Sequence, residues 1–256
     1  MLRLWAPAKL TATLAVTGVR ADGYHELDAE MVTLSLADEL VIDEGGHGLS
    51  VDVEAGTRAE EIPPLDDNLI GRALAACGRR AAVRLTKRIP LGAGLGGGSA
   101  DAGAVLRWAG VRDPALAARL GADVPFCVAG GRARVRGVGE VVIPLEFERR
   151  DYLLALPPFG VDTAAVYRAW DDEPRHEGTN ELAAAALATE PRLGAWRDAL
   201  AELTGSEPRL AGSGSTWFVE GGPPEAGTPD GPELRVGDET ARLVRVRTVP
   251  AGWEGD

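Results

Sequence analysis

Pro90-Leu-Gly-Ala-Gly-Leu-Gly-Gly-Gly-Ser-Ala-Asp101 decides the fold, because this glycine-rich stretch joins two elements that the sequence identifies. Residues 83–89, which precede it, alternate between apolar and polar positions, as a half-buried strand does. The apolar residues that follow it repeat at helical spacing. Ser99 is the candidate N-cap of this helix and Gly110 its candidate end. The sequence therefore predicts a strand, a glycine loop and the N-terminus of a helix, in that order.

A glycine loop before a helix suits an anion. The first turn of a helix presents backbone N–H groups and the positive end of the helix dipole toward one point. Glycine allows the backbone to approach a ligand closely and to adopt positive φ. A tight structural turn is the alternative interpretation of any single Gly-x-Gly-x-x-Gly, here Gly92, Gly94 and Gly97. The density of glycines favours a phosphate site, with a nucleotide as the ligand.

Two common phosphate loops do not fit this stretch. The Walker pattern requires a lysine where this chain has Gly98, so no local side chain reaches the β- and γ-phosphates. The dinucleotide-binding pattern requires a strand that is buried on both faces and an acidic residue about 20 residues further on. The strand before the loop is one-sided, because it carries Arg84, Thr86 and Arg88. Asp113 lies near the required distance but opens a short helix at Pro114.

Composition limits the class of protein. A chain of 256 residues with 45% hydrophobic residues can form one large domain or two modest ones. Its net charge of −12 argues against nucleic acid as the main partner but not against a small phosphate ligand. No apolar run approaches the ~18 residues that a membrane span needs, and no signal peptide follows Arg3. Cys77 and Cys127 form no metal or redox motif, so we expect free thiols in a reducing cytoplasm.

Three further positions are candidates for chemistry, each with a structural alternative. Lys9 lies among apolar residues and is either a solvated lysine or a cation for phosphate. Asp123 lies in the apolar run 121–131 and is either a helix cap or a general base paired with a lysine. Tyr24 and His25, in a loop dense in turn residues, either close that turn or form a platform for a planar ring.

The remaining sequence predicts an α+β protein. We expect strands at 2–5 and 11–17, interrupted at 7–9, and a helix at 68–80 capped by Asp67. The second half is expected to contain helices at 163–170, 180–188 and 193–203, an irregular segment at 221–237 and a last strand at 240–249. The polar run 146–151 is the candidate boundary, which gives domains 1–147 and 148–256.

Three separated segments together resemble a known family. Pro7-Ala-Lys-Leu10, residues 90–100 and Leu210-Ala-Gly-Ser-Gly-Ser215 resemble the three motifs of the GHMP kinase superfamily. Four other segments are similar to the members that act on a cytidine-diphosphate-linked methylerythritol: 17–25, 67–70, 120–126 and 137–140. The resemblance extends from residue 5 to about residue 219. Any one motif is only suggestive, whereas the whole set in the right order is specific.

The resemblance implies a fold and a reaction. The fold would be a ribosomal S5-like N-terminal domain followed by a ferredoxin-like α/β C-terminal domain. The reaction would transfer the γ-phosphoryl group of ATP, with Mg²⁺, to the 2-hydroxyl of the cytidine-diphosphate-linked polyol, a step of the non-mevalonate isoprenoid (terpenoid) pathway. The implied protein is cytoplasmic, a monomer or weak homodimer, and binds neither nucleic acid nor membrane. The alternatives are a GHMP kinase for another small alcohol, such as mevalonate or homoserine, and a non-catalytic nucleotide- or RNA-binding module.

The resemblance also implies the site residues, carried over by position. Those that would wrap the ATP phosphates are Pro90, Leu91, Gly92, Ala93, Gly94, Leu95, Gly96, Gly97, Gly98, Ser99 and Ala100. Those that would lie near adenine are Asn68, Leu69 and Lys87. Cytosine would be held by Tyr24 and His25, with Tyr167 as the second stacking ring and Thr163 beside it.

Lys9 and Asp123 would be the catalytic pair. Phosphoryl transfer depends mostly on positioning and charge stabilisation, which Lys9 could supply to the transferring group. Asp123, held as a carboxylate by the adjacent lysine, could accept the proton of the hydroxyl. The sequence assigns no ligands to Mg²⁺. It departs from the family at Thr11, where an asparagine is usual, and at Ala100, which replaces a second loop serine.

Overall fold

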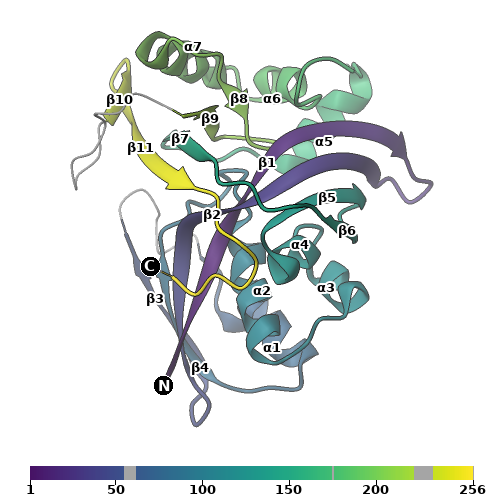
Figure 1. Cartoon of the computed structure of the whole chain (residues 1–256), viewed down its shortest axis with the longest axis vertical. Coiled ribbons are helices and arrows are strands. Elements are labelled where there is room, and N and C mark those ends of the chain that lie inside the picture. Colours follow the sequence, from purple (N-terminus) through teal and green to yellow (C-terminus); the bar gives the residue numbers. More distant parts are fainter. Residues whose placement is uncertain (55–61, 175, 222–232, 256) are drawn as a thin grey trace.

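Two β-sheets form the frame of the protein in the computed structural model, which describes residues 1–54, 62–174, 176–221 and 233–255 (Figure 1). The first sheet has the order β3-β4-β2-β5-β6, with β1 paired to β2, and the second has the order β10-β11-β7-β9-β8. The strands of the first sheet are β1 (Leu2–Val19), β2 (His25–Asp43), β3 (Gly48–Val53), β4 (Ala82–Lys87), β5 (Arg132–Gly137) and β6 (Val141–Pro144). Those of the second are β7 (Asp151–Leu156), β8 (Arg209–Leu210), β9 (Trp217–Glu220), β10 (Glu233–Val236) and β11 (Glu239–Arg247).

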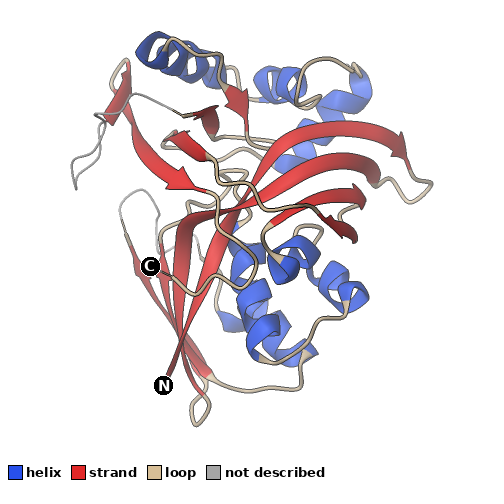
Figure 2. Ribbon diagram, viewed as in Figure 1, coloured by secondary structure: helices blue, strands red, loops and turns tan. Residues whose placement is uncertain are grey.

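The helices fall into two groups, one for each sheet (Figure 2). The first group packs on the first sheet and contains α1 (Leu69–Ala76), α2 (Gly97–Trp108), α3 (Pro114–Leu120) and α4 (Val124–Ala129), with a 3₁₀ turn, η2, at Leu65–Asp67. The second group packs on the second sheet and contains α5 (Thr163–Asp172), α6 (Ala183–Thr189) and α7 (Arg192–Thr204). Segregated helices and mostly antiparallel strands are the α+β arrangement that the sequence predicted.

The first strand is longer than the sequence indicated. We expected a break at residues 7–9, but β1 runs without interruption from Leu2 to Val19 against β2. Its pairing shifts register instead, because Pro7 lies opposite Ala37 whereas Lys9 lies opposite Thr33. Such a bulge re-aims side chains without ending the strand. The expectation of two strands was therefore wrong, and the bulge falls at the segment that carries Lys9.

Three helix starts also differ from expectation. Asn68, rather than Asp67, caps α1, because its side chain accepts a hydrogen bond from the N–H of Ile70. Ser99 does not cap α2, which begins at Gly97 after Gly96 at φ 67°. The start of α4 was not predicted at all: the helix begins at Val124 with Pro125 in its first turn, where proline is tolerated.

A shared apolar cluster joins the two sheets. Ala8 and Leu10 of β1 and Val32 and Leu34 of β2 pack with buried residues of β7 and β9, among them Tyr152, Leu154 and Phe218. The chain passes from the first sheet to the second at residues 145–150, and there we propose the boundary between domains 1–147 and 148–256. Within the part of the chain that the structure describes, no helix is long and apolar enough to cross a membrane.

Only part of the segment that precedes the last strand can be compared with the expectation from the sequence. We expected residues 221–237 to be irregular, and 222–232 lie outside the described residues. Residues 233–236, however, form β10, which pairs antiparallel with β11. The expectation of irregular structure was therefore wrong at the end of this segment. The last strand spans Glu239–Arg247, close to the expected range.

Candidate active site

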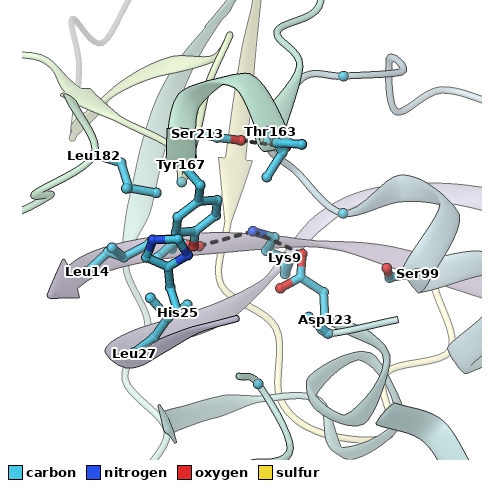
Figure 3. Close-up of a pocket in the computed structure, with 18 of the residues that line it drawn as sticks. Lys9, Leu14, His25, Leu27, Ser99, Asp123, Thr163, Tyr167, Leu182 and Ser213 are labelled. Atoms are coloured by element: carbon cyan, nitrogen blue, oxygen red, sulfur yellow. Dashed lines mark hydrogen bonds and ion pairs between the residues drawn. The ribbon is translucent and has the colours of Figure 1, made fainter. Parts of the chain in front are cut away.

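A cleft of about 870 Å³ lies where the two halves of the molecule meet (Figure 3). Its walls come from segments that are far apart in the sequence. They are β1 (Lys9, Thr11, Leu14), the turn and start of β2 (Gly23, Tyr24, His25, Leu27), the glycine loop, the start of α4 (Asp123), the turn at Val138 and Gly139, α5 (Thr163, Tyr167, Asp171), and Gly212 and Ser213. The three motifs singled out from the sequence therefore line one cavity.

The glycine loop is packed against the second half of the molecule. A Cβ atom on Gly94, which has φ 76°, would lie 2.1 Å from the carbonyl oxygen of Ala211. A Cβ atom on Gly92 would lie 2.9 Å from Cα of Gly160. No other residue type fits at these positions without a shift of backbone. The glycines are therefore required by close packing as well as by conformation.

Hydrogen bonds on this packed side use carbonyl groups of the loop. Gly92 O accepts from the N–H groups of Val161 and Ser215, and Ala93 O accepts from Thr216. On the other side, the first backbone bond of α2 runs from Ala100 N to Gly96 O. The N–H groups of residues 97–99 thus belong to the first turn of α2, where backbone N–H groups have no acceptor within the helix. These residues line the cleft, and such N–H groups form an anion site.

Lys9 and Asp123 meet at the centre of the cleft. The ammonium nitrogen of Lys9 lies 3.3 Å from Oδ2 of Asp123, and it donates a hydrogen bond of 3.1 Å to Oγ1 of Thr11. The Lys9 side chain is 7% exposed and that of Asp123 is 30% exposed. A partly desolvated pair interacts more strongly than a surface pair. The two residues proposed from the sequence are therefore brought together, and both face the cleft (Figure 3).

Asp123 occupies the N-cap position of α4, but its side chain makes no capping hydrogen bond. The structural alternative considered for this residue, a helix cap, is thus not the role of its carboxylate. The turn at 137–140 supports its segment, because a Cβ atom on Gly139 would lie 2.2 Å from the carbonyl oxygen of Ala122. Oδ2 of Asp123 is therefore free to pair with Lys9.

Aromatic rings gather at the other end of the cleft. The rings of His25 and Tyr167 lie 4.6 Å apart at 32°, and Nε2 of His25 lies 2.7 Å from Oδ1 of Asp171. Burial raises the pKa of the Tyr167 hydroxyl, and the negative charge of Asp123 raises it further. Tyr24 is 63% exposed, so its ring is available to a ligand. Leu14, Leu27 and Leu182 line the same end (Figure 3).

The second glycine–serine turn is held by a residue that the sequence did not indicate. Nδ2 of Asn180, which is buried, donates to the carbonyl oxygens of Leu210 and Gly212. The hydroxyls of Thr163 and Ser213 lie 2.8 Å apart and connect this turn to α5. Ser213 belongs to a motif that was singled out, whereas Asn180 was expected only as the start of a helix.

Some residues expected at the nucleotide do not line the cleft. Leu69 does, but Asn68 caps α1. Ala100 is buried in the core of the first half, and Leu95 is buried in the apolar cluster that joins the two sheets. Lys87 is 1% exposed, and its ammonium group is paired with Asp38 and Asp101. The side chain of Lys87 therefore lies beneath the glycine loop and does not line the cleft. The other loop residues expected to contact phosphate, Pro90 to Gly94 and Gly96 to Ser99, all line the cleft.

The sequence is similar to a known family and to curated enzymes. Residues 68–131 match the family described as GHMP kinases N terminal domain. The chain is 40% identical over 234 residues to the 4-diphosphocytidyl-2-C-methyl-D-erythritol kinase of Paracoccus denitrificans (strain Pd 1222), which covers 83% of this chain and 84% of the relative. It is 37% identical over 248 residues to the kinase of the same name from Cereibacter sphaeroides (strain ATCC 17029 / ATH 2.4.9), with 85% and 88% covered.

The fold is also similar to those of solved kinases. The fold is similar to the crystal structure of a 4-(cytidine 5'-diphospho)-2C-methyl-D-erythritol kinase, with a TM-score of 0.71 and 33% identity over 98% of this chain and 100% of that one. It is also similar to a crystal structure of mevalonate kinase, with a TM-score of 0.56 and 11% identity over 98% of this chain and 100% of that one. The second likeness concerns the fold alone.

Proposed function

Because this chain belongs to the family of 4-diphosphocytidyl-2-C-methyl-D-erythritol kinases, we propose that its cleft transfers the γ-phosphoryl group of ATP to the 2-hydroxyl of 4-diphosphocytidyl-2-C-methyl-D-erythritol. The chain is a small-molecule kinase of isoprenoid precursor synthesis, and it uses ATP. A cytoplasmic location and a monomeric or weakly dimeric state are further parts of the proposal.

One observation carries the assignment of the reacting groups, namely the pair of Lys9 and Asp123 beside the glycine loop. In phosphoryl transfer the protein supplies positioning and charge stabilisation, with little covalent chemistry. The ammonium group of Lys9 is a preorganised positive charge for the transferring phosphoryl group. The carboxylate of Asp123 can accept the proton of the attacking hydroxyl.

The atoms balance in this scheme. The 2-hydroxyl oxygen of the substrate forms a bond to the γ-phosphorus as its proton passes to a carboxylate oxygen of Asp123. The bond between the γ-phosphorus and the β–γ bridging oxygen breaks, and its electron pair leaves with ADP. The proton on Asp123 then passes to solvent, which the 30% exposure of its side chain allows. Lys9 keeps its proton throughout and acts by charge alone.

The two ends of the cleft suit the two substrates. At one end, the N–H groups of residues 97–99 would bind the phosphates of ATP, with Leu69 near the base. At the other end, cytosine would lie against the exposed ring of Tyr24, beside the packed rings of His25 and Tyr167. Thr163, which is tied to Ser213, would stand beside the cytidine group. The exposure of Tyr24 supports this arrangement, because its ring can move onto a ligand.

Magnesium would arrive with the nucleotide. Mg²⁺ is usually held by one or two protein oxygens together with phosphates and waters. The described residues contain no group of three or more His, Cys, Asp and Glu side chains that could form a separate metal site. The Ser99 hydroxyl and the Asp123 carboxylate, which both line the cleft, would be two of the side-chain oxygens that complete its coordination. When bound, the ion would neutralise charge on the β- and γ-phosphates.

A substrate panel with ADP release as the readout tests this proposal. The wild-type protein should release ADP with the cytidylylated substrate and much more slowly with the uncytidylylated alcohol, mevalonate or homoserine. Preference for one of the other alcohols would favour a different GHMP kinase, for which the aromatic end of the cleft has no evident use. Binding of ATP without turnover on any of them would favour a non-catalytic nucleotide-binding module.

A further inference from the structure

A buried cluster of three charged residues lies directly beneath the glycine loop. Asp38 comes from β2, Lys87 is the last residue of β4, and Asp101 lies in the second turn of α2. Their exposed fractions are 0%, 1% and 2%. Nζ of Lys87 lies 2.5 Å from Oδ2 of Asp38 and 2.8 Å from Oδ2 of Asp101. None of the three lines the cleft, so the chemistry described above does not use them.

Asp38 fixes the chain where it enters the loop. Its Oδ1 accepts hydrogen bonds from the backbone N–H groups of Arg88, at 2.6 Å, and Ile89, at 2.9 Å. Its other oxygen holds the side chain of Lys87. One carboxylate thus restrains three consecutive residues immediately before Pro90, the first residue of the loop. A charged acceptor makes such bonds stronger than neutral ones.

Lys87 acts at the other end of the loop. A Cβ atom on Gly97 would lie 2.9 Å from Nζ of Lys87 and 3.0 Å from Cγ2 of Ile89. Gly97 begins α2 and also lines the cleft. The ammonium group therefore lies close to backbone that lines the site expected to hold phosphate. The ammonium adds positive charge at the end of the helix that already attracts anions.

Burial and the neighbouring charges act in opposite directions on Asp101 and on Lys87. Burial raises the pKa of Asp101 to about 7, although the charge of Lys87 opposes this effect. Oδ1 of Asp101 has no hydrogen-bond partner among the described residues. A buried oxygen without a partner costs less free energy when its carboxyl group is not fully ionised. Burial favours the neutral form of Lys87, but its two carboxylate neighbours outweigh burial and raise its pKa.

We propose that Asp38, Lys87 and Asp101 are positioning residues for ATP, which hold the glycine loop and the first turn of α2 in the geometry that binds phosphate. The inference rests on the proposed function and adds to it a set of residues that do not line the cleft. A purely structural role explains the cluster less well. Buried ion pairs are a poor source of stability, since apolar residues of the same volume serve as well or better.

The test uses the full chain with Asp38→Asn, Lys87→Met and the two changes combined, and it titrates each protein with ATP. Asp38→Asn turns an amide N–H₂ toward the ammonium group, and Lys87→Met leaves two carboxylates without their cation. Each change should raise the Kd for ATP about tenfold, the size of one charge-assisted hydrogen bond. The double variant removes the clash between the amide and the ammonium group and leaves Asp101 as the single carboxylate of the cluster, so its Kd should rise by much less than the product of the two single effects.

Two further measurements separate positioning from general destabilisation. Amide hydrogen exchange at residues 92–99 should be faster in Asp38→Asn than in wild type before any ATP is added. Leu243→Ala, a cavity in the core against the second sheet, should lower the free energy of unfolding and leave the Kd for ATP unchanged. If Lys87→Met does not fold, Asp38→Asn carries the test through its Kd for ATP and its hydrogen exchange at residues 92–99, with Leu243→Ala as the control.

The results distinguish this inference from the proposed function. Three results would overturn the positioning role. The Kd for ATP of the double variant could rise by the product of the two single effects, or hydrogen exchange at residues 92–99 could be the same in Asp38→Asn and wild type. Leu243→Ala could also raise the Kd for ATP as much as the cluster variants do. Wild-type protein that binds ATP and releases no ADP with the cytidylylated substrate would overturn the proposed function instead. In that case, ATP titration and hydrogen exchange would still test whether Asp38, Lys87 and Asp101 position the glycine loop.

Discussion

Gly96 lies so close to Lys9 that a Cβ atom on the glycine would come within 2.8 Å of Cγ and 3.2 Å of Cε of the lysine. The same added atom would lie 3.6 Å from Oδ2 of Asp123. The glycine loop therefore supplies more than backbone N–H groups for phosphate. It also sets the space in which the lysine and the carboxylate meet.

We expect Gly96→Ala to lower kcat about 100-fold, because the new methyl group displaces the ammonium group of Lys9 from the reacting centre. Steady-state kinetics with the cytidylylated substrate measures this effect. Gly110→Ala is the matched control. Gly110 also has positive φ, at 73°, and nothing lies within 4 Å of its added Cβ, so this variant carries the same backbone strain of about 1 to 2 kcal/mol with no clash. Equal kcat values for the two variants would contradict the steric explanation.

Thr11→Val should lower kcat about tenfold, because the Lys9 ammonium loses the hydroxyl acceptor that orients it. Thr11→Ser keeps a hydroxyl at this position and should retain most of the activity. The KM for ATP should change little in either variant, since Thr11 lies on β1 and not in the glycine loop. A valine variant with the kcat of wild type would show that the bond between Lys9 and Thr11 has no part in catalysis.

Tyr24→Ala should raise the KM for the cytidylylated substrate about tenfold, the typical loss for one stacked base. Because Tyr24 is 63% exposed, its removal should leave the Tm unchanged. Tyr24→Phe keeps the ring and should behave like wild type. If Tyr24→Ala binds the substrate normally, cytosine is held by His25 and Tyr167 without this ring.

Stability should depend on pH through Asp101. Its folded-state pKa is raised from 3.8 to about 7, chiefly by burial, so the folded protein binds this proton more tightly than the unfolded chain. The resulting contribution to stability is complete below about pH 4 and is lost as the pH rises to about 7. Asp101→Asn has no such loss. Urea denaturation should therefore show the stability of the variant rising relative to that of wild type between about pH 4 and about pH 7, and a constant difference would contradict the raised pKa.

Local patterns in the sequence were sufficient for the glycine loop and its neighbours. The alternation at residues 83–89 corresponds to β4, and the helical spacing after Ser99 corresponds to α2, which ends before Gly110 as expected. These elements could be predicted because their periodicity and glycines act within a few residues. The three helices predicted for the second half are also present, since α5, α6 and α7 overlap the predicted ranges.

Long-range pairing is what the sequence could not reveal. Pro7 was expected to interrupt a strand, but pairing with β2 and a register shift carry β1 through it. Lys87 was expected to lie near adenine, and no local pattern indicated its partners Asp38 and Asp101, which come from other elements and hold its side chain inside the protein. Asn180 likewise has no local pattern, because its role is to bind carbonyl groups of a distant turn.

The central claim, that Lys9 and Asp123 form the reacting pair, is tested most directly by the kcat of Asp123→Asn measured beside its Kd for ATP. The amide keeps the size of the carboxylate but cannot accept the proton of the hydroxyl. We expect kcat to fall about 1,000-fold, within the range for loss of a general base, while the Kd for ATP stays within about threefold of wild type. An Asp123→Asn protein that retains nearly the kcat of wild type would contradict the account.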